Sequence, residues 1–217
     1  MWRKILEVLI AIMGITYIFF IPEEPIGIKM VFKIIPMLLI IVFAFIQPSG
    51  DSKRYKLLIM IGLFICMWAD GLIYWFIAGL ITFLIGHIWY IFAFRHIKSS
   101  TIPKWVAVLL IAYGIAMVVW IAGTLWSEGE SILAIAVVVY IVVILLMGWN
   151  AFQTGNKFAI IGAILFIFSD SVLAINRFIA SVPFSDALIM ISYYGAQFLF
   201  AYSIYAHYSA SRKNLLK

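Results

Sequence analysis

Two aspartates lie inside long apolar runs of the sequence, where a charged side chain is unusual. Asp70 sits in FICMWADGLIYWF (residues 64–76), and Asp170 sits in IGAILFIFSDSVL (161–173). An ionisable side chain in a membrane helix costs about 2.5–3.5 kcal/mol on insertion scales, so it usually faces the bundle interior and serves a function. Two carboxyl groups can divide acid–base catalysis, one donating a proton and the other accepting one. The alternative is that both aspartates only form ion pairs that hold helices together.

The composition of the 217-residue chain is that of a membrane protein, with 66% hydrophobic and 11% charged residues. The formal net charge of +6 does not indicate a nucleic-acid partner, because no dense basic run with interleaved polar residues is present. The single cysteine, Cys66, excludes an internal disulfide. The sequence therefore predicts an all-α integral membrane protein that forms one transmembrane helical domain over residues 1–217.

Eight apolar segments are expected to cross the bilayer, each close to the length of about 20 residues that a spanning helix needs. They cover residues 5–21, 28–47, 57–75, 77–94, 105–126, 131–150, 158–176 and 186–208. A tight hairpin is expected at Tyr74–Ile77, where the boundary between spans is weakest, and seven spans is the alternative count. Arg3 and Lys4 precede the first segment as in a signal peptide, but no small-x-small cleavage site follows, so this segment is expected to be a retained helix.

Lysine and arginine are distributed unevenly over the connections between these segments. With eight spans, one side of the membrane receives Arg3, Lys4, Lys53, Arg54, Lys56, Arg95, Lys98, Lys104, Lys157, Arg212, Lys213 and Lys217. The other side receives Lys29, Lys33 and Arg177 near helix ends, together with Glu23, Glu24, Glu128 and Glu130. Because basic residues accumulate in cytoplasmic loops, both termini of this multi-pass protein are expected on the cytoplasmic side of the cell membrane.

The two aspartate-containing segments align with each other at an offset of 100 residues, which pairs Gly62 with Gly162 and Asp70 with Asp170. Such an offset suggests two parallel four-helix halves, related by an axis along the membrane normal. Chance similarity between two apolar helices explains the alignment equally well.

The rise of a helix, about 1.5 Å per residue, converts sequence position into depth and predicts one layer of polar side chains. Asp70 and Asp170 lie at nearly the same depth, and Arg177 lies above Asp170 on the same helical face. Other helices bring Lys33, His87, Tyr193, Tyr194 and Gln197 toward this layer. His87 and Gln197 have an equally simple interpretation as hydrogen-bonded core residues.

Motifs of common soluble enzymes are absent from the sequence, including a phosphate-binding glycine loop, HExxH, CxxC and GxSxG. Asp70, His87 and Asp170 are of the right types to bind a metal ion. They are dispersed without a spacing signature, so no metal site is expected.

Three stretches resemble the signatures of the YhhN-type lysoplasmalogenase family. GLFICMWADGLIYWFIAGLITFLIGHIWYIFAF (62–94) is similar to the first, in which a glycine-rich helix ends in an aspartate and the next helix leads to GHxxY, here ending at Tyr90. GAILFIFSDSVLAINRF (162–178) resembles the second signature, and SYYGAQFLFAYS (192–203) resembles the closing tyrosine and glutamine segment. The resemblance covers nearly the whole chain.

Two positions depart from the pattern of that family. FKIIPM (32–37) is similar to its Lys–Pro pair, but two residues separate Lys33 from Pro36. Ala69 precedes Asp70, where the family more often has a glycine.

The resemblance implies an eight-helix membrane hydrolase that cleaves the vinyl ether of lysoplasmalogens, a class of lysophospholipid, in the bilayer. The products are a fatty aldehyde and glycerophosphocholine or glycerophosphoethanolamine, and no metal or organic cofactor is implied. Asp70 and Asp170 are then the expected catalytic pair. The expected substrate-binding residues are Lys33, His87, Tyr90, Arg177, Tyr193, Tyr194 and Gln197.

Vinyl ether hydrolysis needs one carboxylic acid to protonate carbon and one carboxylate to activate water. Asp170 is the expected base, because a cation such as Arg177 nearby favours the charged form of a carboxyl group. A small transporter or lipid carrier with buried carboxylates is the alternative function. A structural or regulatory membrane protein is a third interpretation.

Overall fold

The apolar segments of the sequence form long helices in the computed structural model, which describes residues 2–22, 24–50 and 52–215. A backbone in hydrocarbon cannot bond to water, so an apolar segment satisfies its own N–H and C=O groups as a helix. The elements are α1 (Trp2–Phe20), α2 (Ile26–Ile46), α3 (Lys53–Leu72), α4 (Phe76–His96), α5 (Lys104–Met117), η1 (Val118–Ala122), α6 (Gly123–Ser127), α7 (Ser131–Gln153), α8 (Lys157–Phe178) and α9 (Ser185–Leu215).

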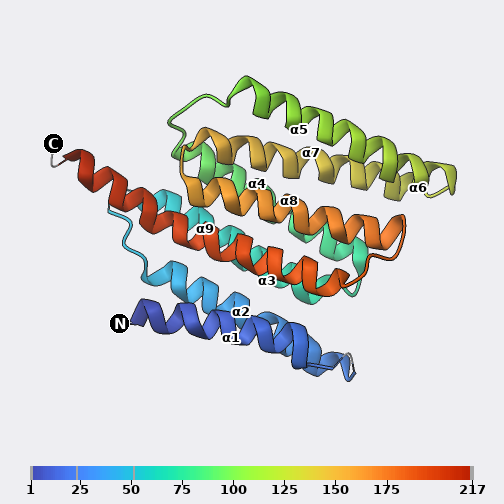
Figure 1. Cartoon of the computed structure of the whole chain (residues 1–217), viewed down its shortest axis with the longest axis horizontal. Helices are drawn as coiled ribbons and strands as arrows, with labels where there is room; N and C mark the ends of the chain where they lie inside the picture. The colour runs from blue at the N-terminus through green and yellow to red at the C-terminus, as the bar shows by residue number, and fades with distance from the viewer. Residues whose placement is uncertain (1, 23, 51, 216–217) are drawn as a thin grey trace.

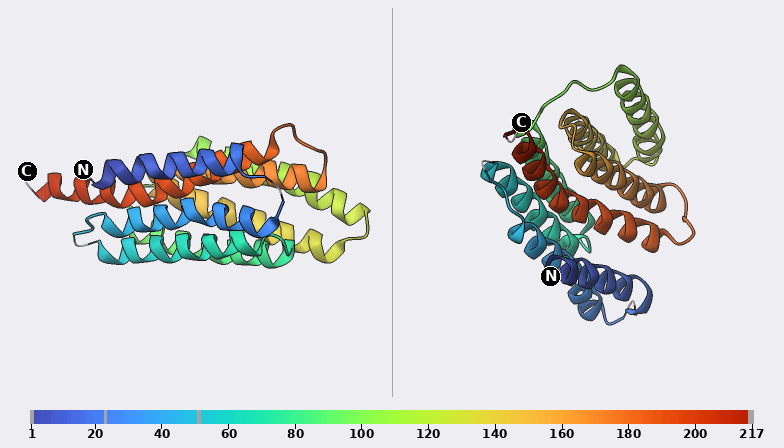
Figure 2. Two further views of the ribbon diagram at one scale, coloured as in Figure 1. Left: turned by 90° about the horizontal axis from the view of Figure 1, so that it is seen from below. Right: turned by 60° about the vertical axis from the view of Figure 1, so that its left-hand side comes forward.

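The helices run up and down beside one another in an elongated bundle (Figure 1 and Figure 2). Both termini lie at one end of the bundle, which we call the terminal end. The described parts of the connections at residues 21–22, 24–25, 73–75, 128–130 and 179–184 lie at the other end, which we call the opposite end. The pairs α3–α4 and α8–α9 pack most closely, while α1 lies along α2 and α9, and α5 lies along α7.

Among the described residues, seven helices are long and apolar enough to cross a membrane, with α5, η1 and α6 counted as one from Lys104 to Ser127. The first helix, α1, carries Arg3, Lys4 and Glu7 and is not among the seven. Many large apolar side chains are exposed on the outside of the bundle. Since soluble proteins rarely expose contiguous apolar surface on this scale, the chain is an all-helical integral membrane protein.

The predicted segment boundaries agree with the helices to within a few residues, except in α9. The hairpin expected at Tyr74–Ile77 is a turn at residues 73–75, between the end of α3 and the start of α4. The last helix continues to Leu215, beyond the predicted end at residue 208. Glu23 and Lys217, which contribute to the charge asymmetry, lie outside the described residues.

Glycines allow the closest helix pairs to approach each other. A Cβ atom at Gly62 of α3 would lie 2.4 Å from the ring of Tyr90 in α4, and one at Gly162 of α8 would lie 2.8 Å from the ring of Phe200 in α9. Small residues at such positions let membrane helices pack backbone against side chain. The two glycines that align at an offset of 100 residues therefore have the same packing role.

The fifth apolar segment is not the regular helix that the sequence predicts. Five residues, Val118–Ala122, form the π-helical turn η1 between α5 and α6. A π-helical turn adds a residue to the local repeat, and such turns are frequent at functional sites.

Candidate active site

The first aspartate, Asp70, is held by side chains from two other helices. It lies near the end of α3 with only 2% of its surface exposed. The ammonium group of Lys33, from α2, lies 3.6 Å from its Oδ1 atom. The hydroxyl of Tyr193, from α9, donates a hydrogen bond of 2.7 Å to its Oδ2 atom. Both carboxylate oxygens of Asp70 therefore have a partner, and one of these partners is a cation.

A cavity of about 490 Å³, which we call the Lys33 cavity, opens beside this ion pair. Lys33 and Asp70 line it together with residues of α1 and α9, and Glu24, Lys29 and Asp186 line its part near the opposite end. Small-molecule sites in proteins commonly enclose about 300–1,000 Å³. The Lys33 cavity is thus large enough for a polar ligand, and it offers charged groups of both signs.

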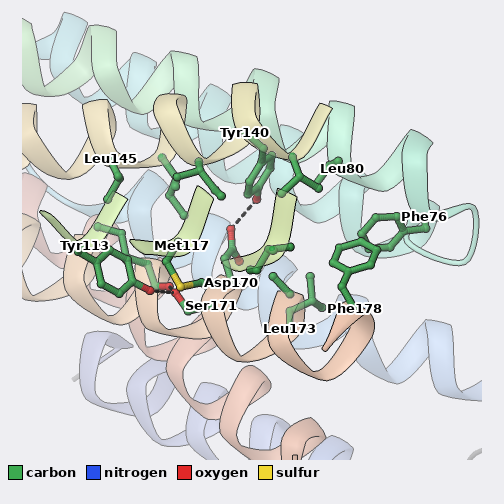
Figure 3. A pocket seen from close by; sticks show the side chains of 16 residues that line it. Phe76, Leu80, Tyr113, Met117, Tyr140, Leu145, Asp170, Ser171, Leu173 and Phe178 are labelled. Carbon is green, nitrogen blue, oxygen red and sulfur yellow. Dashed lines mark hydrogen bonds between the residues drawn. The ribbon is translucent and has the colours of Figure 1, made fainter. Parts of the chain in front are cut away.

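The second aspartate, Asp170 of α8, has a different partner. The hydroxyl of Tyr140, from α7, donates a 2.5 Å hydrogen bond to its Oδ2 atom (Figure 3). Within the part of the chain that the structure describes, no lysine or arginine forms an ion pair with Asp170. A second hydrogen-bonded pair, Tyr113 and Ser171, lies next to it (Figure 3). Asp170 is therefore a carboxyl group supported by a phenol rather than by a cation.

The space beside Asp170 is small and mostly apolar, with a volume of about 40 Å³, and we call it the Asp170 cavity. It lies between α4, α5, α7 and α8, and Figure 3 shows Leu80, Met117 and Phe178 among its walls. A water molecule needs about 10–15 Å³ of such volume and two to four polar partners. The Asp170 cavity has the volume for a water molecule, and the carboxyl group of Asp170 and the hydroxyls of Tyr113 and Ser171 supply polar partners.

The two cavities adjoin each other. Leu173 of α8 lines both the Lys33 cavity and the Asp170 cavity. A ligand that fills the Lys33 cavity would contact Asp70, and the side chain of Leu173 would lie between it and the Asp170 cavity.

Comparison with known proteins assigns the chain to a family. The sequence model of the YhhN family matches residues 28–204, which is most of the chain. The chain belongs to the YhhN family. All nine expected site residues of this YhhN-family protein, from Lys33 to Gln197, lie within the matched stretch.

Curated relatives of this YhhN-family chain include proteins named lysoplasmalogenase. Lysoplasmalogenase TMEM86B of Rattus norvegicus is 28% identical over 205 residues, which cover 93% of this chain and 84% of that protein. Lysoplasmalogenase TMEM86B of Homo sapiens is 27% identical over 87% of this chain and 81% of its own length. Lysoplasmalogenase TMEM86A of Homo sapiens is 31% identical over 67% of this chain and 64% of its own length. No solved structure matches the YhhN-family chain.

Four of the expected residues, Lys33, Asp70, Tyr193 and Tyr194, lie together in one place in the bundle. Lys33, Asp70 and Tyr193 are in direct contact, as described above. The hydroxyl of Tyr194 donates a 2.8 Å hydrogen bond to the backbone oxygen of Lys33, which ties α9 to α2 beside the ion pair.

Three others, His87, Tyr90 and Gln197, lie in the core and line neither cavity. The hydroxyl of Tyr90 donates a 2.6 Å hydrogen bond to Oε1 of Gln197, which joins α4 to α9. His87 packs edge-on against the rings of Tyr140 and Phe166, and its two nitrogens have no hydrogen-bond partner among the described residues. The bond between Tyr90 and Gln197 is the kind expected of core residues that join helices, whereas His87 lacks the hydrogen bond that its interpretation as a core residue predicted.

Arg177, which was expected above Asp170 on the same helical face, forms no ion pair with Asp170 among the described residues. Its guanidinium group lies 5.3 Å from the centre of the Phe76 ring, at the start of α4. This cation–π contact places the positive charge toward the opposite end of the bundle. The reason for expecting Asp170 to be the charged base is therefore removed.

Sequence reasoning missed Tyr140, the hydrogen-bond partner of Asp170. Tyr140 is the only residue with a polar group in the run AVVVYIVVILL (136–146). A hydroxyl at the centre of an otherwise apolar span needs a partner when buried, and this signal would have identified it. Among the described residues, no group of three or more His, Cys, Asp or Glu side chains is arranged to hold a metal ion.

Proposed function

We propose that this protein is a lysoplasmalogenase, a membrane hydrolase that cleaves the vinyl ether bond of alkenyl lysophospholipids. One observation carries the proposal: two carboxyl groups, the buried Asp70 and the half-buried Asp170, have different partners. Asp70 has a cation and a phenol, whereas Asp170 has a phenol alone. The membership of the YhhN family and the lysoplasmalogenase names of the curated relatives support it.

Asp170 supplies the proton in the proposed mechanism. A vinyl ether resists base but is protonated by acid at its β-carbon, which gives an oxocarbenium ion. Apolar surroundings without a paired cation favour the neutral form of a carboxyl group. Tyr140 occupies one oxygen of Asp170 and leaves the other free to carry the proton toward the substrate. We therefore assign the acid to Asp170, the reverse of the assignment that the sequence suggested.

Asp70 acts as the carboxylate. The ammonium group of Lys33 and the hydroxyl of Tyr193 both favour its charged form. The carboxylate stabilises the oxocarbenium ion and accepts a proton from the water that adds to it. The product of this step is a hemiacetal, and at this stage Asp170 is deprotonated and Asp70 is protonated.

Collapse of the hemiacetal restores both groups. Asp170 accepts the hydroxyl proton as the aldehyde forms, and Asp70 returns its proton to the departing glycerol oxygen. One water molecule is consumed, and no other reactant is needed. The logic resembles the paired carboxyl groups of glycoside hydrolases, as an analogy in chemistry only.

The Lys33 cavity is the proposed site of the headgroup. Lys29 and Lys33 suit the phosphate, and Glu24 and Asp186 suit the ammonium group of choline or ethanolamine. Arg177, at the same end of the bundle, is the alternative phosphate partner. A zwitterionic headgroup thus matches a cavity that has both signs of charge.

We further propose that α1 is an eighth span and that the helices form two parallel halves. Two packing patterns support the repeat: α3 packs on α4 as α8 packs on α9, and α4 packs on α7 as α2 packs on α9. Both termini are then cytoplasmic, because basic residues gather at the terminal end. A reporter fused after Lys217 should read cytoplasmic and one inserted at Glu128–Glu130 external. Reporters on the same side would exclude eight spans.

An assay with purified protein tests the function. Incubation with an alkenyl lysophosphocholine in detergent should release the fatty aldehyde, and the alkyl analogue without the double bond should release none. Absence of aldehyde, combined with proton- or lipid-dependent flux in liposomes, would replace the hydrolase by the transporter alternative.

A further inference from the structure

A long apolar groove runs along the outside of the bundle between α5 and α7. It has a volume of about 500 Å³ and is lined by residues of α5 and η1 between positions 110 and 119 and residues of α7 between 141 and 149. Its walls are aliphatic, apart from Gly114 and Trp149. We call it the α5–α7 groove.

The α5–α7 groove is continuous with the site through shared walls. Ile141 and Leu145 line both the groove and the Asp170 cavity, and Leu173 lines both the Asp170 cavity and the Lys33 cavity. Figure 3 shows Leu145 on one side of Asp170 and Leu173 on the other. The three spaces therefore follow one another, from a charged cavity, past the two carboxyl groups, to an apolar groove.

The irregular turn η1 lies where the groove meets the Asp170 cavity. Val118 of η1 lines the groove, and Ile121 of η1 lines the cavity. Gly114, one turn earlier, keeps the groove open, because a Cβ atom there would lie 2.5 Å from Cδ1 of Leu145. The local departure from a regular helix thus coincides with the passage between the two spaces.

We infer that the α5–α7 groove binds the alkenyl chain of the substrate, with Gly114 and Leu145 controlling entry to it. The inference rests on the proposed function and extends it by naming the chain site. In an alkenyl lysophospholipid, the vinyl ether lies between the polar glycerophosphate and the hydrocarbon chain. A headgroup in the Lys33 cavity and a chain in the groove place this bond between the two, beside Asp70 and Asp170.

The direction of the groove matches the way a lysolipid lies in a bilayer. Glu24 and Asp186, at the start of the path, lie near the opposite end of the bundle. The groove runs from η1 toward Leu110 and Trp149, and thus toward the terminal end. A bound lysolipid would keep its headgroup near one membrane surface and its chain directed inward.

A second groove offers a competing place for the chain. It lies between α1 and α9, has a volume of about 410 Å³, and contains Gly14 and Tyr194. Ile18 lines both this α1–α9 groove and the Lys33 cavity. A chain placed there would leave the headgroup cavity without passing Asp170, and it would lie beside the carboxylate of Glu7. Of the two grooves, it is the α5–α7 groove that brings the scissile bond past both carboxyl groups.

Photocrosslinking of the unmodified protein tests the inference without relying on turnover. The probe is an alkyl lysophosphocholine with a diazirine at the end of its chain, which lacks the vinyl ether and is not hydrolysed. We expect crosslinks within residues 110–119 and 141–149, and we expect excess unlabelled alkyl lysophosphocholine to remove them. Crosslinks within residues 7–18 and 191–198 would overturn the inference. Crosslinks that the competitor does not reduce would also overturn it, since they would report ordinary bilayer contact.

A matched pair of substitutions tests the same inference by activity. Gly114→Leu fills the α5–α7 groove, and the atom it meets is the end of the flexible Leu145 side chain. Gly14→Leu fills the α1–α9 groove, where an added Cβ makes only an ordinary contact with Tyr194 at 3.6 Å. Single methylene groups in such pockets change rates by about 10–200-fold.

Gly114→Leu should therefore lower the rate ratio between long-chain and short-chain alkenyl substrates by at least about tenfold, and Gly14→Leu should leave the ratio unchanged. The reverse pattern would overturn the chain site while leaving the hydrolase intact. If the wild-type protein released no aldehyde from any substrate, the proposed function would fail, and the crosslinks would still decide where the chain binds.

Discussion

The two aspartates occupy matching positions in sequence, but their surroundings differ in charge. Asp70 has the Lys33 ammonium group and the Tyr193 hydroxyl on its two oxygens. Asp170 has the Tyr140 hydroxyl and no ion-pair partner among the described residues. Two identical side chains can therefore take opposite roles, because the neighbours of a carboxyl group decide whether its charged or its neutral form is favoured.

The Lys33 cavity and the Asp170 cavity also differ in charge, as the two aspartates do. The Lys33 cavity measures about 490 Å³ and has charged walls, whereas the Asp170 cavity measures about 40 Å³ and is mostly apolar. The first suits a hydrated, zwitterionic group, and the second suits the reacting bond, a water molecule and a protonated carboxyl. In the proposed mechanism this difference divides the work: the region around Asp70 holds the headgroup beside the catalytic carboxylate, and the region around Asp170 supplies the proton.

The largest expected effect is loss of catalysis on replacing either aspartate. Asp70→Asn and Asp170→Asn keep the side-chain volume and remove the acid–base group, which typically costs about 10²–10⁴-fold in rate. The double variant should be little slower than either single one, because the two groups act as a unit. Aldehyde release provides the measurement. Near-normal activity of Asp170→Asn would remove the acid from the mechanism.

Removal of the ion pair should lower both the stability of the protein and its affinity for the lysolipid. Lys33→Met leaves the Asp70 carboxylate buried without its cation, and breaking a buried pair costs about 3–5 kcal/mol of the free energy of unfolding. The loss should fall at or below the lower end of this range, because Lys33 is 16% exposed. The melting temperature in detergent should drop and KM for the lysolipid should rise.

The double variant Lys33→Met with Asp70→Asn is the control for this change. It removes both charges, so the melting temperature should recover toward that of the wild type while the activity stays low. A double variant as unstable as Lys33→Met would mean that the lysine packs rather than pairs.

The sequence predicted the elements and the depth of the site well. Apolar segments with basic flanks determine where helices begin and end, and the rise per residue places Asp70, Asp170 and Lys33 in one layer. The contact of Tyr193 with this layer was also predictable. These features depend on position along the helix axis, which a sequence gives directly.

Rotation about the helix axis was less predictable. In a span that is apolar on all sides, no periodic pattern indicates which face meets a neighbour. For this reason Tyr140 was missed, and so was the contact of Arg177 with the ring of Phe76. The turn η1 was also missed, because the residues VVWIA carry no proline or glycine that would signal an irregular helix.

The smallest expected effects come from the two tyrosines that hold the carboxyl groups, and they test the assignment of roles most directly. Hydrogen bonds to charged groups contribute about 1.5–3 kcal/mol, whereas those between neutral groups contribute about 0.5–1.5 kcal/mol. Tyr193→Phe removes a bond to the proposed carboxylate Asp70, so kcat/KM should fall by about 10–150-fold. Tyr140→Phe removes a bond to the proposed neutral acid Asp170, so the fall should be about 2–10-fold.

Tyr194→Phe is the matched control for this comparison. Its hydroxyl donates to the backbone oxygen of Lys33 and to no carboxyl group among the described residues, so kcat/KM should fall least of the three. If Tyr140→Phe were instead the most damaging change, the charge would reside on Asp170 and the two roles would be exchanged. Equal losses at Tyr140 and Tyr193 would mean that the aspartates share one proton, since each phenol would then spend the same time bound to a charged oxygen.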